Sequence, residues 1–391
     1  VIMRVSTKCL GLGVLLTGLV FSAPAQGQAN PPAPFLLAVT DITGKFVTGS
    51  LPKTNPLQQA GCTSCGNVPE ELLPPRPGDD GCGSGCVAGG ACKPCQSDTM
   101  CGRLYCCFYN ALCCPDPCYE PRWVPGANAA LFVDSTRPVG HTRIRWDSGH
   151  RLTRPDRGEY FWARPAPLGK GPAVVPQRVH YDQLSIYTEF GTEKFGGFVD
   201  MPFRAWNGTP GGSGGGFGDI RVGSKSVLLD TEVVQIALQF TTSIPTGAAN
   251  KGVGTGHVAL EPALLTSIKL HEDTYFQGQI GNSIPIAADP AFGGSVLDYR
   301  FAVNHVFARP WADSQFIGTL EAVGYSFFGG ASTNPLTGLA ERAGGTNIFS
   351  VGPGVRWIIS KNCDLGFGML FAVTKEHLAG QLYRTELRFR F

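Results

Sequence analysis

Cysteine is the residue type with the most concentrated chemistry in this sequence. Cys62-x-x-Cys65 and Cys92-x-x-Cys95 have the spacing of zinc ligands. The other spacings are irregular, however, and no histidine lies between Cys62 and Cys118. Thiols of an exported chain meet oxidising conditions, so we expect disulfides, within the segment or to other envelope proteins. The expected disulfide cysteines are Cys62, Cys65, Cys82, Cys86, Cys92, Cys95, Cys101, Cys106, Cys107, Cys113, Cys114 and Cys118.

Motifs for catalysis or cofactor binding are missing from the sequence. It has no His-Glu-x-x-His. Its Gly-x-Ser-x-Gly match at 211–215 is not a nucleophile elbow, since it lies in the glycine-rich run 211–218, which fits an outside loop, and this run is not followed by Gly-Lys-Ser/Thr. Glu376 and His377 are the one pair that would suit a hydrolase at a barrel rim, and we interpret them as solvated loop residues. We therefore expect no enzyme, no cofactor and no metal. With 32 basic and 30 acidic residues, nothing favours nucleic acid as a partner.

Charged and apolar side chains alternate through the last eleven residues, 381–391. Because side chains of a strand alternate between its faces, one face carries aromatic and aliphatic groups and the other carries charges. In a membrane barrel the apolar face meets lipid and the charged face lines the lumen. The alternative is an edge strand of a soluble sandwich. Tyr383, Leu387, Phe389 and Phe391 resemble the C-terminal signal that the barrel-assembly machinery recognises.

The same alternation predicts which side chains line the lumen. Eight basic groups on this face oppose five acidic ones, Asp219, Glu261, Asp298, Asp364 and Glu386, a mild bias that favours anions. The alternative is that these charges pair across neighbouring strands and fill a narrow barrel. The predicted lumen-facing residues are Arg221, Lys225, Gln235, Gln239, Glu261, Lys269, Arg300, Arg356, Arg384, Glu386, Arg388 and Arg390.

Regular segmentation from residue 180 onward predicts the elements that position these side chains. Each segment is long enough to cross a bilayer as a tilted strand, which takes about 9–11 residues. The strand at 315–328 is mixed, with Glu321 among apolar neighbours. The predicted strands are 180–190, 194–203, 217–229, 232–244, 257–270, 274–285, 297–308, 315–328, 347–359, 363–374 and 381–391.

The connections between these segments alternate between short turns and long Gly/Asn/Pro-rich loops. Outer-membrane barrels have short periplasmic turns and longer outside loops, and a soluble sandwich has no reason to sort its loops in this way. We therefore predict an all-β fold, an antiparallel up-and-down transmembrane barrel with a periplasmic C-terminus. An even strand number needs a twelfth strand, which we place at about 157–163; adding 129–134 and 142–147 would give fourteen.

The part before the barrel is predicted to be irregular. Residues 1–25 have the basic start, short apolar run and small-residue site of a secretory signal. We predict a linker at 26–61, the cysteine-rich segment at 62–118, a connecting region at 119–156 and the barrel at 157–391. Beyond the first segment, no run of 18 apolar residues predicts a transmembrane helix.

Three glycine-rich motifs between residues 218 and 257 resemble a known family. They are Gly218-Asp219 with Gly223 and Lys225, Pro245-Thr246-Gly247, and Gly252-Val253-Gly254-Thr255-Gly256. In this order they resemble the outer-membrane transporter barrels labelled "MetA-pathway of phenol degradation". The piece 144–162 and the cysteine-rich segment look like planctomycete relatives of that group. The resemblance implies a barrel that passes small or hydrophobic compounds.

We therefore expect a channel or transporter of the bacterial outer membrane that passes small, hydrophobic or anionic solutes. Its expected partners are outer-membrane lipid, the barrel-assembly machinery and the solutes themselves. The alternative is a structural envelope protein, anchored by its barrel and cross-linked through the cysteine-rich segment.

Overall fold

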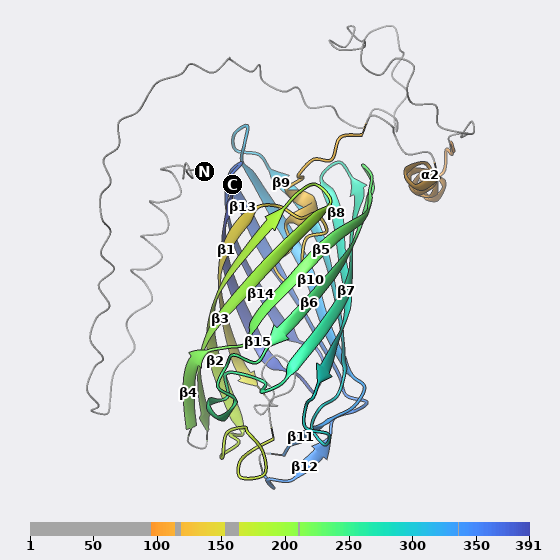
Figure 1. Ribbon diagram of the computed structural model, residues 1–391. Coiled ribbons are helices and arrows are strands. Elements are labelled where there is room, and N and C mark those ends of the chain that lie inside the picture. Colours follow the sequence, from red (N-terminus) through yellow and green to blue (C-terminus); the bar gives the residue numbers. More distant parts are fainter. Residues whose placement is uncertain (1–94, 114–118, 153–163, 210–211, 335) are drawn as a thin grey trace, which may run out of the picture. The chain divides into compact units, whose positions relative to one another are not determined.

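The computed structural model describes residues 95–113, 119–152, 164–209, 212–334 and 336–391. The predicted signal peptide, the linker, most of the cysteine-rich segment and the strand predicted at 157–163 lie outside these residues. The described chain is almost entirely β-structure (Figure 1). No helix among the described residues is long and apolar enough to cross a membrane.

Thirteen strands form one antiparallel sheet, and twelve of them close into a barrel. The first strand, β1, pairs with β15 on one side and β2 on the other, and β2 pairs with β3. The thirteenth, β4 (Gly212–Phe217), pairs only with β3. The barrel strands are β1 (His141–Leu152), β2 (Arg178–Gly191), β3 (Phe195–Thr209), β5 (Ile220–Asp230), β6 (Val234–Ile244), β7 (Val258–His271), β8 (Thr274–Ile286), β9 (Val296–Ala308), β10 (Gln315–Phe327), β13 (Asn347–Ser360), β14 (Cys363–Ala372) and β15 (Ala379–Arg390).

The twelve-stranded antiparallel barrel that the sequence predicts is confirmed, but its first strand differs. β1 occupies part of the segment that we predicted to be a connecting region, 119–156, and contains 142–147, one of the two extra strands of the fourteen-stranded alternative. The other, 129–134, was a wrong prediction, because these residues form no strand. In β1, Ile144 and Trp146 are exposed, whereas Arg143 and Arg145 are buried. Apolar and polar side chains stop alternating after Asp147, so the sequence pattern did not predict the full length of this strand.

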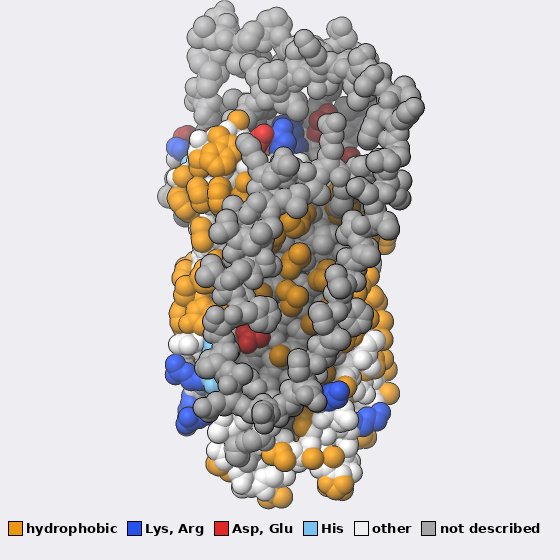
Figure 2. Space-filling view, turned by 90° about the vertical axis from the view of Figure 1, so that its left-hand side faces the viewer, with side chains coloured by type: hydrophobic (Ala, Val, Ile, Leu, Met, Phe, Trp, Pro, Cys, Tyr) orange, Lys and Arg blue, Asp and Glu red, His pale blue; other side chains and the backbone are white. Residues whose placement is uncertain are grey.

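Most side chains on the outer surface of the barrel are apolar, with polar exceptions such as His180 and Asp182 of β2 and Ser224 of β5. A closed barrel leaves no strand edge unpaired, and the period of two then puts one set of side chains outside and the other inside. Figure 2 shows hydrophobic side chains over the described part of one side of the wall, with basic and histidine side chains near one end of this zone. Exposed examples from different strands are Trp146, Leu184, Phe203, Leu238, Leu264, Ile280, Val303, Leu320, Val355 and Phe367.

The two ends of the barrel differ in the length of their connections. Short turns follow β2, β5, β7, β9 and β13, and they lie at the end where β1 begins and β15 ends. We call this the turn end. Longer connections follow β1, β3, β6, β8 and β10 at the other end, the loop end. The connection after β14, residues 373–378, is also at the loop end but is no longer than the one after β9, residues 309–314. Short strands β11 (Ala331–Thr333) and β12 (Ala340–Arg342) pair within the loop after β10.

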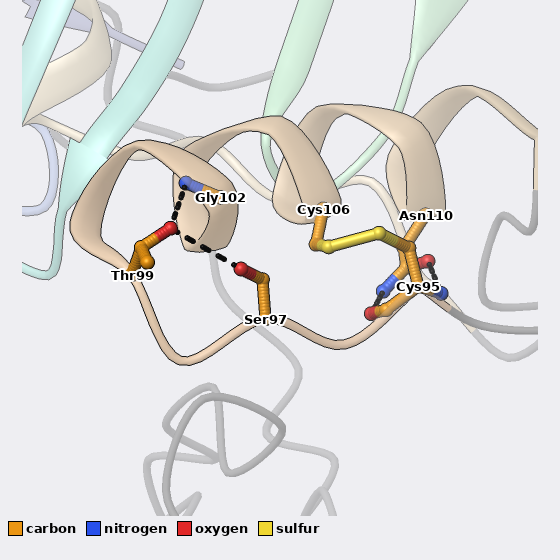
Figure 3. The surroundings of a disulfide bond; sticks show 6 residues. All are labelled: Cys95, Ser97, Thr99, Gly102, Cys106 and Asn110. Carbon is orange, nitrogen blue, oxygen red and sulfur yellow. Dashed lines mark hydrogen bonds between the residues drawn. A yellow bond between two sulfur atoms is a disulfide. The ribbon is translucent and has the colours of Figure 1, made fainter.

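The cysteine-rich segment contributes one described helix, α2 (Met100–Cys113). A disulfide joins Cys95 to Cys106 and ties the preceding chain to the middle of the helix (Figure 3). The Asn110 side chain accepts a hydrogen bond from Cys95 N (2.7 Å) and donates one to Cys95 O (3.1 Å). The hydroxyl of Thr99 accepts from Gly102 N at the start of the helix. This pair agrees with the prediction of disulfides within the segment.

Candidate functional site

A segment of the chain just before β1 lies inside the barrel and fills its turn-end half. We call residues 126–137 the plug. It begins with a short 3-10 helix, η3 (Gly126–Asn128), and continues without regular structure. Gly126–Val133 are buried, and Ala129 is completely inaccessible to solvent. In Figure 1 the helix lies among the strands at the end where the C-terminus is labelled. The lumen is therefore closed by the protein's own chain.

The plug is fastened where it enters and leaves the lumen. On the way in, the Trp123 ring lies 3.8 Å from the guanidinium of Arg390, a cation–π contact. On the way out, Arg137 donates to both carboxylate oxygens of Asp230 at 2.7 and 2.8 Å. Both bonds come from one nitrogen, Nη2, and both side chains of this ion pair are buried. The plug thus enters and leaves at the turn end.

Arginines of the wall bind the backbone carbonyls of the plug. Five consecutive carbonyls, from Asn128 to Phe132, each accept a hydrogen bond from a guanidinium. The donors are Arg388 to Asn128 (3.3 Å), Arg356 to Ala129 (2.7 Å) and Ala130 (3.3 Å), Arg384 to Leu131 (2.8 Å), and Arg300 to Phe132 (3.1 Å). Buried carbonyls of a segment without regular structure need such partners, since an unmet one costs about 1–3 kcal/mol.

Acceptors of the wall bind the amides of the same stretch. The two carboxylate oxygens of Glu321 accept from Leu131 N (2.8 Å) and Phe132 N (2.7 Å). Gln277 accepts from Ala130 N at 3.0 Å, and Gln279 accepts from Asp134 N at 3.1 Å. Glu321 explains why a carboxylate interrupts the apolar pattern of β10: it is a fully buried receptor for the plug backbone.

Packing fixes the tip of the plug at mid-height in the barrel. Leu131 occupies a groove over two inward-facing glycines of β14. A Cβ atom at Gly366 or Gly368 would lie 2.6 Å from a methyl group of Leu131, closer than real contacts allow. The ring of Phe132 lies 4.2 Å from the Arg384 guanidinium. Both side chains pack on Val323 and Leu370, with Tyr325 and Leu382 beside them.

Asp134 carries a negative charge into the lumen. Its carboxylate lies 3.2 Å from Arg143 and accepts from Gln239 at 3.3 Å. Burial alone would raise the pKa of Asp134, but the charges of Arg143, Lys225 and Arg300 outweigh burial and hold it well below its usual range. The plug therefore contributes a permanent anion to a wall rich in arginine.

Ion pairs neutralise most of the wall charges at this level. Arg356, which is fully buried, pairs with both Asp364 and Glu386. Arg384 makes two hydrogen bonds to Asp147, at 2.7 and 2.8 Å. Buried ions are tolerated only when paired and hydrogen-bonded, and here the plug carbonyls complete the shell of each guanidinium.

The three glycine-rich motifs meet at the loop end of the lumen. The carboxylate of Asp219 accepts from Gly247 N at 2.9 Å and from both N and Oγ1 of Thr255 at 2.7 Å. The Thr246 hydroxyl donates to Gly218 O at 2.9 Å. These bonds hold the loop 245–257 in place, and Lys251 O in that loop accepts from the indole of Trp206 at 2.7 Å. The motifs are thus structural and fix one loop over the barrel mouth.

Two small cavities lie between the plug and the loop end. One has a volume of about 70 Å³ and is lined by Phe132, Tyr181, Tyr325, Arg384 and others. The second, also about 70 Å³, includes Asp200, Arg204, Arg221 and Glu261 in its lining. A water needs roughly 10–15 Å³ of such volume, so each cavity holds a few waters and no ring-sized solute.

The predicted lumen residues lie on the inner face, in three groups. Arg300, Arg356, Arg384, Glu386, Arg388 and Arg390 surround the plug. Gln235 and Gln239 also reach it, through Thr136 and Asp134. Arg221 pairs with Glu261 at 2.6 Å towards the loop end. Lys225 is buried against Glu189, and Lys269 pairs with Glu232 at the turn end.

Sequence reasoning missed several residues of this site, among them Glu321, Arg143, Arg145, Asp147, Gln277 and the plug itself. A signal was present for four of them: Glu321 interrupted an apolar strand, and Arg143, Arg145 and Asp147 lie in 142–147, where charged and other side chains alternate. Outside the lumen, Tyr383, Leu387 and Phe389 are half-buried on the outer face of β15 and Phe391 is half-exposed. His377, in the loop after β14, contacts Lys375 O at 2.8 Å.

Comparison with known proteins gives similar barrels but no family. No protein-family model and no curated protein matches the sequence. Solved structures similar to the chain include a COG4313 outer membrane channel from Pseudomonas putida F1 (13% identity, TM-score 0.44, 69% of this chain and 100% of that one). Others are the NanC porin (8%, 0.38, 64% and 100%) and the KdgM porin in complex with disordered oligogalacturonate (12%, 0.35, 64% and 99%). The family-level resemblance seen in the sequence stays a prediction.

Proposed function

We propose that this protein is an outer-membrane channel that admits small solutes through a lumen closed at rest by the plug. The observation that carries the proposal is the inverted polarity of the barrel: apolar side chains outside on every wall strand, and charged or amide side chains inside. Apolar surface of this extent is unstable in water and is stable in lipid. A closed barrel also satisfies all wall backbone groups, as lipid requires.

The turn end lies in the periplasm under this proposal, and the loop end faces outward. Short turns on the periplasmic side are the general rule for such barrels. The plug then occupies the periplasmic half of the lumen, and a solute that enters from outside meets it at mid-height. The arginines around the plug favour anionic solutes, and the family resemblance favours small or hydrophobic ones.

Reconstitution of the full chain tests the channel. Purified protein in planar bilayers should show rare openings, because the plug closes the lumen most of the time. Glu321→Gln, which weakens the plug's attachment, should open the channel more often. Glu261→Gln serves as the matched control, since Glu261 pairs with Arg221 away from the plug. Absence of conductance in all three proteins, each shown to be folded in the bilayer, would contradict the channel.

A structural role in the envelope is the second candidate, and the filled lumen favours it. A barrel that is permanently plugged could anchor a cysteine-rich segment that is cross-linked to neighbouring proteins. Its signature would be multimers of high mass that collapse on reduction, with no permeability in any variant. Conductance without such multimers would leave the channel as the function.

A further inference from the structure

The backbone carbonyls of the plug accept hydrogen bonds from the wall arginines, as the oxygens of an anionic solute would. Carbonyl oxygens are the atoms that the guanidinium groups contact, and they carry partial negative charge. Arg356 and Arg384 each hold a wall carboxylate and, in addition, donate to plug carbonyls. A guanidinium has five N–H donors, so one carboxylate leaves donors over. When the plug is withdrawn, those donors face the lumen and lose the carbonyl acceptors that the plug supplies.

The wall keeps a positive excess at this level. Seven arginines of the wall surround the plug: Arg143, Arg145, Arg300, Arg356, Arg384, Arg388 and Arg390. The wall carboxylates that pair with them or with the plug amides are six, namely Asp147, Asp200, Asp298, Glu321, Asp364 and Glu386. Asp134 of the plug pairs with Arg143 and supplies a seventh carboxylate. Withdrawal of the plug therefore removes one negative charge and five carbonyl dipoles from this zone.

An apolar pocket lies directly beside these donors. Leu131 and Phe132 fill it now, packed on Val323 and Leu370 and flanked by Tyr325. The ring of Phe132 lies 4.2 Å from the guanidinium of Arg384, whose Nη1 also donates to Leu131 O. The vacated site would thus offer a guanidinium for an anionic group and, next to it, a pocket for a ring.

We infer that the plug occupies the binding site of the solute, and that this solute is a small carboxylate with an apolar ring. The carboxylate replaces the carbonyls of Leu131 and Phe132 at Arg384 and Arg300, and the ring replaces the side chain of Phe132. Solute and plug exclude each other, so the solute opens its own path by binding the state from which the plug is withdrawn. This inference rests on the proposed channel function.

Benzoate, benzamide and acetate separate the two parts of this recognition. Benzamide keeps the ring without the charge, and acetate keeps the charge without the ring. In single-channel recordings of the full chain, benzoate should raise the fraction of time spent open about tenfold or more, because a ligand shifts a two-state equilibrium by its differential affinity. Benzamide and acetate at the same concentration should have little effect.

Variants of one arginine assign the response to the site. Arg384→Gln also removes a donor to the plug, so it should raise the open fraction without solute and abolish the further rise with benzoate. Arg384→Lys should retain a weaker response to benzoate, since lysine keeps the charge but not the planar fork. The lysine variant also covers the case in which the glutamine variant does not fold. Arg309→Gln is the matched control, because Arg309 pairs with Asp273 on the outside of the turn end, away from the plug.

Different outcomes of these recordings would contradict the solute-binding site and the channel function itself. A channel that opens but responds equally to benzoate and benzamide overturns the inference and leaves the channel intact. A full response in both Arg384 variants also overturns it. No conductance in the parent protein or in Glu321→Gln overturns the proposed function, and the inference with it.

Discussion

Glu321 decides whether the plug stays in the lumen, because it is a buried carboxylate that receives two plug amides. Hydrogen bonds to charged groups contribute about 1.5–3 kcal/mol each. In Glu321→Gln one of the two amides would face an NH₂ group, so we expect backbone amides at 131 and 132 to exchange with deuterium at least about tenfold faster. Hydrogen-exchange mass spectrometry of the plug peptide measures this. Unchanged exchange, with Glu261→Gln as the control, would show that Glu321 does not hold the plug.

The contact between Leu131 and the glycines of β14 predicts a compensating pair of substitutions. Gly368→Ala places a methyl group where Leu131 lies, and Leu131→Ala empties the groove. Each change alone should raise deuterium uptake of the plug; a buried Leu→Ala change costs about 2–5 kcal/mol. The double variant should destabilise the plug by less than the sum of the two single effects, since contacting residues couple by about 0.5–3 kcal/mol. If the two single effects simply add, Leu131 does not contact Gly368.

Individual lumen residues were predictable from alternation, but their partners were not. The period of two puts Arg356 and Arg384 inside without any knowledge of the fold. Nothing in that pattern says that their donors meet carbonyls of residues 129–131, which are far away in sequence. Gly366 and Gly368 likewise could be placed on the inner face, whereas their purpose depends on the position of Leu131. The sequence pattern therefore predicts which face of a strand a side chain occupies, whereas the residues that it contacts depend on the tertiary structure.

At the scale of elements, strands were predicted well where one face is apolar throughout. The expected 274–285 and 297–308 are close to β8 and β9, because short turns limit how far each strand can extend. The plug has no period: Gly-Ala-Asn-Ala-Ala-Leu-Phe-Val is small and apolar, which suits a strand, a helix or a buried irregular segment equally. Its conformation is set by the wall that surrounds it.

The outer face of β1 gives a prediction for membrane placement. Trp146 lies near the middle of β1, and its partners across the strands are Thr385 and Leu184. Trp146→Arg should lower the free energy of unfolding in lipid vesicles by about 2–4 kcal/mol, as expected for a cation near the bilayer midplane. Phe190→Arg, at the turn end of β2, should lower it by about 0–1 kcal/mol. Urea titration of the refolded variants measures both. Equal effects would contradict the assigned membrane level.

The loop 245–257 should loosen when its carboxylate receptor is removed. Asp219→Ala deprives Gly247 and Thr255 of three hydrogen bonds. We expect trypsin to cut at the exposed Lys251 several times faster than in the parent protein, because proteolysis follows the population of the opened loop. Asp289→Ala, which removes the partner of Arg164 in another loop, is the control. Equal cutting rates in all three proteins would argue against this role of Asp219.

The whole molecule encloses a segment of its own chain when the barrel closes. Only Pro138, Val139 and Gly140 separate the plug from β1, and β1 pairs with β15, the last strand of the barrel. Closure of this seam therefore fixes the plug at its β1 end. Small residues at 126–130 let the chain pass through a lumen already crowded with arginine side chains. The inside of the barrel wall is polar and its outside is apolar, so the plug supplies most of the hydrophobic core inside the barrel.

A disulfide-bonded cysteine of the wall predicts a covalent tether for the other end of the plug. Cys363, at the turn-end start of β14, is buried and disulfide-bonded. Every other cysteine of the sequence lies at or before position 118, ahead of the plug. We therefore expect a bond from Cys363 within the chain to tie the wall to the part of the chain that precedes the plug, and to prevent the plug from being pulled far from the turn end.

This tether is testable without knowledge of the partner cysteine. A protease site inserted beside the exposed Lys170, between β1 and β2, allows the chain to be cut once. Under denaturing conditions without reductant the two pieces should stay joined, and reductant should separate them. In Cys363→Ser they should separate without reductant. Pieces of the parent protein that part before reduction would contradict a bond within the chain. A ladder of reductant-sensitive multimers would instead place the partner in a neighbouring envelope protein and favour the structural role.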